Sequence, residues 1–417
     1  MPFRSFRGRP CVAALLAGAL AWPWPAAALT LDEALRLAER EAPTLAAQAA
    51  SQQAARSAAI PAGELPDPKL TLGVQNLPIE EDDRWSVNRD SMSMRMIGVM
   101  QEMTNGDKRQ ARVEVAQAGI EVADAEQRIA LLTVRRQTAL AWIANLAVER
   151  KLALFQELYT ENRLFERTVR ARIAGGKGLA ADAVLPRQEK ALLDEQQDEL
   201  QQARSSARAA LRRWIGAAAG QVLQGDWPRW PTDTAHYQHN LQRHPELAVF
   251  APQTRQAEAR VREAIAAKKP DWGWELDYLK RGNHYSDMVN LKFTFDLPLF
   301  TGSRQDPKIA VERARVTQLE AEREARVREH TWALEDELAG YQRLDQALKR
   351  LDQTLLPLAE EKVRLALADY SGGKGSLEAV VEARQERIRT CLRRIDLAEQ
   401  YAASGAGLHF AFGDIEP

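Results

Sequence analysis

Long stretches of the chain repeat their apolar positions every seven residues, which is typical of helices that pack along a continuous seam. From Asp107 to Ala174 there is no proline and only one glycine, Gly119. Nine positions follow one another at seven-residue steps in this stretch: Val113, Ile120, Gln127, Val134, Ala141, Val148, Phe155, Asn162 and Val169. All except Gln127 and Asn162 are apolar. Because a helix rises 1.5 Å per residue, the pattern predicts a rod about 100 Å long.

Shorter segments alternate apolar and polar residues, which predicts β-strands with one apolar and one polar face. The segments with this alternation are "KLTLGVQ" at 69–75, "DWGWELDY" at 271–278 and "VNLKFTFDL" at 289–297, and the methionine-rich "DSMSMRMIGVMQEM" at 90–103 follows the first of them. A sheet packed on a soluble core would give the same alternation. Segments near ten residues with Trp and Tyr on the apolar face favour strands of an outer-membrane barrel.

The chain is duplicated. Gly-Gly-Lys-Gly occurs at 175–178 and again at 372–375, and each copy is followed at the same distance by Arg-Gln-Glu. Each half contains a helix (about 31–60 and 245–267), two strand-like segments, and two long helices separated by the glycines. We divide the chain into a first repeat at 29–215, an irregular linker at 216–243 and a second repeat at 244–417.

The glycine pairs interrupt long helical sequence, where glycine can adopt the left-handed conformation that ends a helix. We therefore expect a helical hairpin turn at each site. A phosphate-binding loop would need a preceding buried strand and a Ser or Thr after the lysine, and neither copy has them.

Residues 1–28 have the features of a secretory signal peptide: Arg4, Arg7 and Arg9, the apolar run "CVAALLAGALAW", and small residues up to Ala28. Basic and acidic residues are balanced at 57 and 58, so no concentrated basic face indicates a nucleic-acid partner. If cleavage follows Ala28, Cys391 is the only cysteine left.

Four strands are too few to close a barrel, because the smallest membrane barrels contain about eight. Unpaired strand edges in lipid cost several kcal/mol for each polar backbone group. If these strands span a membrane, several chains must combine them into one barrel, and the rods must continue that barrel as a conduit.

Over nearly the whole mature length, the chain resembles the TolC-like outer-membrane efflux channels. The motifs that carry the resemblance are "LTLDEALRLAEREAPTL", "LPDPKLTLGVQN", "LPLFTGSR" and the repeated glycine turns. The resemblance implies a mainly α fold with a membrane β-barrel portion, in which a homotrimer combines four strands per chain into twelve. Duplicated helical hairpins would form a periplasmic tunnel below the outer membrane of a Gram-negative bacterium.

The resemblance also implies a tripartite efflux system in which this channel is a passive exit duct. Its partners would be a periplasmic adaptor, an inner-membrane transporter of the proton-driven resistance-nodulation-division type, and outer-membrane lipid. The periplasmic tip, where partners dock, would consist of Gly175, Gly176, Lys177, Gly178, Gly372, Gly373, Lys374 and Gly375.

Acidic residues that line the closed tip in some family members match Glu382 most nearly, with Glu378 and Asp182 nearby. These three are the candidate gate. The counterpart of Glu382 in the first repeat is Leu185, so an acidic ring here is asymmetric between the repeats. The segment "QEMTNGDKR" at 101–109 also departs from the family, whose members often have proline and glycine at other positions.

Five methionines lie between Met92 and Met103, a pattern similar to channels of heavy-metal efflux pumps, and thioethers are good ligands for Cu(I). The alternative is that they are the lipid-facing side of a strand. Because a charge facing lipid at mid-bilayer costs about 2–4 kcal/mol, we expect Arg95 to face the lumen and the methionines to face outward. Asn290, Lys292 and Asp296 are the other residues expected to face the pore.

Two other classes of function remain. A periplasmic adaptor also uses long helical hairpins, but it has one hairpin and lacks the duplicated strands. The mature chain contains no strong catalytic, cofactor-binding or metal-ligand spacing, so we expect no enzyme, cofactor or metal site. His236, His239 and His244 cluster in or beside the linker, where surface loop histidines are a sufficient account.

Overall fold

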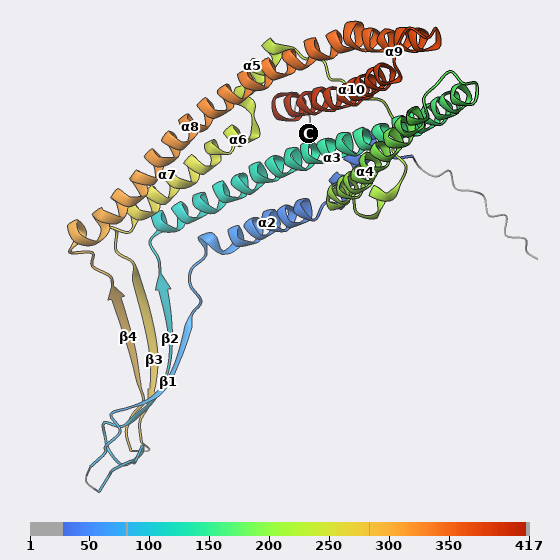
Figure 1. The fold of residues 1–417 in the computed structure, drawn as a ribbon. Coiled ribbons are helices and arrows are strands. Elements are labelled where there is room, and N and C mark those ends of the chain that lie inside the picture. The colour runs from blue at the N-terminus through green and yellow to red at the C-terminus, as the bar shows by residue number, and fades with distance from the viewer. Residues whose placement is uncertain (1–27, 81, 283, 414–417) are drawn as a thin grey trace, which may run out of the picture.

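The protein is an elongated molecule with a small sheet at one end and long helices over the rest of its length (Figure 1). The computed structural model describes residues 28–80, 82–282 and 284–413. Apart from Ala28, the predicted signal peptide lies outside the described residues.

The four predicted strands form one antiparallel sheet in the order β1–β2–β3–β4. Their bounds are β1 (Lys69–Gln75), β2 (Met94–Met103), β3 (Trp272–Lys280) and β4 (Met288–Phe295). Two strands come from each repeat, and β2 pairs with β3 across the boundary between the repeats. The sheet therefore joins the two halves of the chain.

Each strand continues into a helix, and the helices lie side by side in the same order as the strands (Figure 1). These helices are α2 (Pro43–Ala59, extended by the 3₁₀ turn Ile60–Gly63), α3 (Gly106–Ala174), α7 (Phe250–Ala266) and α8 (Thr301–Arg350). One chain thus forms a strip of wall in which four strands pass into four helices.

Two helical hairpins extend away from the sheet, and both turn at the far end of the molecule (Figure 1). In the first, α3 reverses through a 3₁₀ turn (Ala180–Val184) into α4 (Leu185–Ile215). In the second, α8 passes through a π-helical segment (Leu351–Leu355) into α9 (Leu356–Ser371), which reverses into α10 (Leu377–Phe412). The hairpins pack through α3 and α10.

Short elements surround the middle of the rods. They are α1 (Leu31–Glu41), the 3₁₀ turn Gly216–Gly220, α5 (Thr234–Asn240), the 3₁₀ turn Leu241–Arg243 and α6 (Pro245–Ala248). Trp142 of α3 is 1% exposed in the largest cluster here. Its indole N–H donates to the Leu29 carbonyl at 3.2 Å, so the first described residues are tied to the centre of α3.

Prolines interrupt two helices that the sequence analysis predicted to be continuous, and one lies beside an irregular segment of a third. The helix expected at 31–60 is interrupted at Ala42, which is extended (φ −65°, ψ 119°) before Pro43, as expected for a residue preceding proline. The helix expected at 245–267 is interrupted at Val249, since Pro252 cannot donate to the Ala248 carbonyl. The second rod contains the π segment immediately before Pro357.

Among the described residues, no helix has both the length and the apolar character needed to cross a membrane.

Candidate functional site

The sheet has one almost entirely apolar face. Directly opposed residues of antiparallel strands point to the same side, and the pairing Leu72–Ile97, Ile97–Tyr278 and Tyr278–Val289 carries one side across all four strands. Most large side chains on this face are exposed: Leu70, Leu72, Val74, Ile97, Val99, Trp272, Leu276, Tyr278, Val289, Leu291, Phe293 and Phe295. An exposed apolar surface of this kind marks contact with lipid or with another protein.

The opposite face is polar and more enclosed. It contains Lys69, Thr71, Gln75, Glu102, Glu275, Asp277, Asn290, Lys292 and Thr294. Asp277 is 4% exposed and Leu279 7%, whereas Leu276 on the apolar side is 46% exposed. Lys292 forms an ion pair with Glu275 at 2.6 Å. Because side chains of the middle strand β3 are more buried on this polar face, we take it as the inner side of the sheet.

The strand register corrects the sequence prediction for Arg95. Arg95 is paired with Val74 and Lys280, so it lies on the apolar face. It cannot share a surface with Asn290 and Lys292, which belong to the polar face. The expectation that Arg95 faces the pore while the neighbouring methionines face outward is therefore wrong.

The position of Arg95 along the strand explains the error. Arg95 is the second residue of β2, at the loop end of the sheet, and its guanidinium donates to Asn88 Oδ1 at 3.2 Å. The sequence analysis used the free-energy cost of a charge that faces lipid at mid-bilayer. That cost falls nearly to zero at the membrane surface. Asp296 follows β4, and its N–H donates to the Asp271 carbonyl at 2.8 Å.

Each helix turn ends its rod through the same backbone motif. In the first, Gly176 has φ 69°, its N–H donates to Ile173, and the Lys177 N–H donates to Arg172. In the second, Gly373 has φ 74°, its N–H donates to Tyr370, and the Lys374 N–H donates to Asp369. This is the Schellman motif, which needs a left-handed residue at one position.

The three glycines of each turn have different roles. Only Gly176 and Gly373 are left-handed there. A Cβ at Gly375 would lie 3.0 Å from the Asp369 Cβ, and one at Gly178 would lie 3.2 Å from Ile173, so close approach of neighbouring atoms favours glycine at these two positions. The first glycine of each turn, Gly175 or Gly372, has ordinary φ and room for a Cβ.

A buried ion pair joins the two hairpins close to their turns. The Arg384 guanidinium donates to Glu189 Oε1 at 2.9 Å, and the residues are 6% and 3% exposed. Arg384 also lies over the Phe165 ring, 4.8 Å from its centroid. Closer to the tip, Arg172 of the first hairpin donates to the Tyr370 carbonyl of the second at 2.7 Å. The two turns are thus fixed to each other.

The candidate gate residues lie at this end of the molecule but differ in their surroundings. Asp182 Oδ2 accepts the Leu179 N–H at 3.0 Å, so it caps the short 3₁₀ turn. Glu378 and Glu382 are exposed on α10. Within the described part of a single chain, these three carboxylates form no ion pair with the exposed Lys177 or Lys374.

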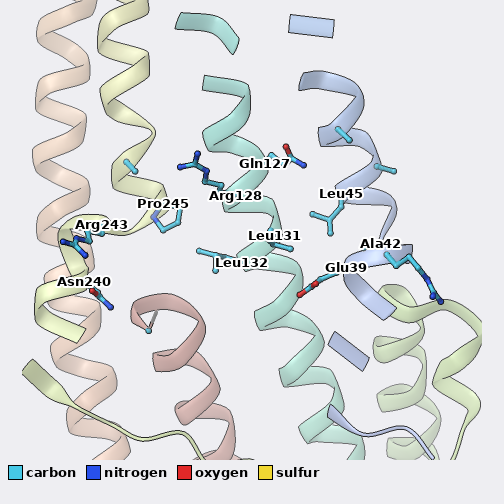
Figure 2. Close-up of a pocket in the computed structure, with 15 residues that line it drawn as sticks. Glu39, Ala42, Leu45, Gln127, Arg128, Leu131, Leu132, Asn240, Arg243 and Pro245 are labelled. Atoms are coloured by element: carbon cyan, nitrogen blue, oxygen red, sulfur yellow. The ribbon is translucent and has the colours of Figure 1, made fainter. Parts of the chain in front are cut away.

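A groove of about 1190 Å³ lies on α3 between α2 and the α6 region (Figure 2). Leu45, Leu131 and Pro245 give it an apolar floor, and Arg128 and Arg243 lie at its rim. These are packing and surface groups, and we assign the groove no catalytic role.

A group of potential metal ligands lies where α6 meets α8. His244, Glu246 and His330 bring ligand atoms within 4.8 Å of one another. His244 was expected on a loop surface but is 5% exposed. Its Nδ1 accepts the Glu246 N–H at 3.1 Å, and His330 Nε2 lies 3.2 Å from Glu246 Oε2. Burial and the nearby His330 lower the pKa of His244 to about 4. These contacts give the group a structural role at the helix junction.

The sequence model of the family described as outer membrane efflux protein matches residues 236–414. The similarity to this family covers the C-terminal part of the chain. The match confirms the resemblance inferred from the sequence, and it includes β3, β4 and the second hairpin of the second repeat. No curated protein matches the chain.

Solved structures share the fold over most of their length. The outer membrane protein VceC of Vibrio cholerae has a TM-score of 0.76 at 17% identity, covering 92% of this chain and 96% of VceC. CusC, whose structures concern transmembrane channel formation, has a TM-score of 0.77 at 15% identity and covers 92% of each chain. The open MtrE outer membrane channel of Neisseria gonorrhoeae has a TM-score of 0.76 at 18% identity, covering 92% and 88%.

Sequence reasoning missed the buried pair between Glu189 and Arg384, although the signal was present. The two residues belong to the repeated Arg-Gln-Glu sequences that follow the glycine turns, Arg187–Glu189 and Arg384–Glu386. Recurrence of a charged triplet at one distance from a turn indicates a shared structural role. The sequence could not show that one member of each triplet pairs across the repeats.

The left-handed glycines give the first prediction. Gly176→Ala and Gly373→Ala should each destabilise their turn by about 1–2 kcal/mol, because a Cβ is unfavourable in that conformation. Gly175→Ala and Gly372→Ala are matched controls and should be neutral or slightly stabilising. Amide hydrogen exchange of the two hairpin ends measures the difference. Equal effects at neighbouring glycines would contradict the assignment.

The buried ion pair gives the second prediction. Glu189→Ala leaves the buried Arg384 guanidinium with only the more distant Glu161 carboxylate, at 3.9 Å, and should cost up to about 3–5 kcal/mol. Arg170→Ala, which breaks the surface pair with Glu166 along α3, should cost at most about 1 kcal/mol. Thermal melting and limited proteolysis at the hairpin ends measure both. Replacing Glu189 and Arg384 together by Met should restore much of the loss, and a double variant no better than Glu189→Ala would refute this account.

Proposed function

We propose that the protein is the outer-membrane channel of a tripartite efflux system, a passive exit duct that crosses the outer membrane and extends through the periplasm. The observation that carries this proposal is the strip of wall, in which a sheet with an exposed apolar outer face passes directly into long helices. The family match of residues 236–414 supports it.

The two open edges of the sheet support assembly from several copies. β1 and β4 each have one neighbour in the chain, so each presents a row of unpaired backbone groups. In a hydrocarbon layer these groups need partners. Pairing β4 of one copy with β1 of the next closes a barrel, and three copies supply twelve strands. We therefore propose a homotrimer.

The hairpins support the same assembly. In the first repeat, the surface around Phe165 and Val169 is covered by α10 of the same chain. The corresponding surface of the second repeat is a groove of about 390 Å³ lined by Leu358, Lys362 and Leu365, and both leucines are more than half exposed. In the internal repeat, α4 of the first half corresponds to α10 of the second half. We therefore expect α4 of a second copy to cover this groove, as α10 covers the equivalent surface of the first repeat.

The length of the rods places the turns far from the membrane. The 69 residues of α3 extend about 100 Å at the helical rise. We propose that the tip residues at 175–178 and 372–375 meet a periplasmic adaptor, and through it an inner-membrane transporter of the resistance-nodulation-division type. A periplasmic adaptor function for this chain itself is less well supported, because its sheet exposes an apolar face.

We propose that Asp182, Glu378 and Glu382 contribute to closure of the tip. A single exposed ion pair contributes at most about 1 kcal/mol. Repeated three times around a ring, contacts with Lys177 and Lys374 of neighbouring copies would add together in the closed state. In the barrel, Asn290, Lys292 and Asp296 stay our proposed pore-facing residues, and Arg95 is removed from that set.

The test is ion conductance of the full-length protein in planar bilayers. We expect discrete channels of low resting conductance, and a higher resting conductance in the Asp182→Asn, Glu382→Gln double variant. Both changes remove charge, and Asn keeps an oxygen that can cap the Leu179 N–H. Lys190→Gln, which removes an exposed charge paired with Asp194 along α4, is the matched control.

The outcomes separate the channel from the gate. Failure of the wild-type protein to insert and conduct would refute the channel function. Normal channels whose resting conductance is the same in the double variant would refute the role of these carboxylates and leave the channel function intact.

A further inference from the structure

The methionines of this chain are concentrated at the sheet. The sequence has seven, and all except Met1 lie between Met92 and Met103 or at Met288. The helices that make up most of the molecule have none, although methionine is a good helix former. This distribution calls for an explanation specific to the sheet.

Four of these methionines lie on the polar inner face. Met96 is opposite Gly73 and Leu279, and Leu279 is opposite Met288. Met94 and Met100 point to the same side as Met96, because they are two and four residues away on the same strand. Met103 is three residues after Met100, an odd number, so it lies on the opposite, apolar face, where it is paired with Trp272.

Packing against lipid does not account for the inner methionines. They share their face with Lys69, Glu275 and Lys292, and the apolar surface is on the other side of the sheet. Met94, Met96 and Met100 are half-buried along the polar side of β2. A stripe of thioethers therefore follows the polar surface in the direction of the strand.

A buried carboxylate lies in the same stripe. Asp277 is directly opposite Gly98, between Met96 and Met100, and it is 4% exposed. A Cβ at Gly98 would overlap Asp277 Oδ1, so the glycine makes room for the carboxylate. Asn290 donates to Oδ2 at 3.4 Å, while Oδ1 has no hydrogen-bond partner among the described residues. A buried carboxylate oxygen without a donor is available to a cation.

We propose that this stripe is a path of weak sites for soft monovalent cations, Cu(I) or Ag(I), along the lumen of the barrel. Thioether sulfur selects such ions over hard cations, and Asp277 supplies negative charge. Met94 and Met96 are about 6.6 Å apart at the strand rise, so their flexible side chains can converge on one ion. Successive weak sites suit conduction, because each must bind and also release its ion.

The proposal rests on the channel function and adds a class of substrate to it. The test uses Ag⁺ alone as the ion, since it is soft and needs no reductant. The sample is the purified full-length channel carrying Cys391→Ser, because a thiol would bind Ag⁺ more tightly than a thioether. Isothermal titration measures Ag⁺ binding, and planar-bilayer recording measures the effect of Ag⁺ on a K⁺ current.

The key variant replaces Met94, Met96 and Met100 by Leu, which keeps apolar volume and removes sulfur. We expect its Ag⁺ affinity to fall about tenfold or more and its K⁺ conductance to become insensitive to Ag⁺. Met103→Leu, on the opposite face, is the matched control and should bind Ag⁺ like its parent. Asp277→Asn should weaken binding without abolishing it.

The results distinguish this inference from the channel function. Normal K⁺ channels with equal Ag⁺ binding in the triple variant and the Met103→Leu control would overturn the soft-cation path and leave the channel function standing. Loss of Ag⁺ binding in the Met103→Leu control alone would also overturn it, because the site would then lie on the outer face. Absence of any K⁺ conductance in the parent protein would refute the channel itself.

Discussion

The backbone hydrogen bonds at the edges of the sheet constrain the whole molecule. β1 and β4 each lack a neighbour on one side, and the sheet exposes an apolar face that favours a hydrocarbon environment. In that environment unpaired N–H and C=O groups are too costly to leave open. The duplication, the strip of wall and the uncovered groove of the second hairpin are the features expected of a chain that forms one part of a closed ring, as we propose.

The internal repeat gives that ring two different contacts. The contact within a chain is fixed by the buried pair of Glu189 and Arg384 and by Arg172 on the Tyr370 carbonyl. Phe165 and Arg172 of the first repeat correspond to Lys362 and Asp369 of the second repeat. In the proposed ring, Lys362 and Asp369 lie at the contact between copies. The seam between copies is therefore less apolar and less strongly bonded near the tip. A tunnel built this way would open first between chains, and each hairpin pair would move as a unit.

Much of the fold could be predicted from the sequence because its signals are local. Heptad spacing predicted α3 to within a residue, alternation predicted β1, and the glycine pairs predicted both turns. The helix break at Pro43 was missed because periodicity continues through it. Arg95 was assigned to the wrong face because the free-energy cost of its charge was judged at mid-bilayer, whereas it lies near the end of β2. The face on which it lies is determined by the cross-strand register. The pair of Glu189 and Arg384 depends on contacts between hairpins, which no local pattern contains.

The central claim is that several copies of this chain combine their strands into one barrel. Native mass spectrometry of the full-length protein, released from detergent micelles under increasing collision energy, tests it most directly. The account predicts a species with three times the mass of the mature chain that survives until the chains unfold. A stable species with the mass of a single folded chain would contradict it, because one sheet with two open edges would then suffice.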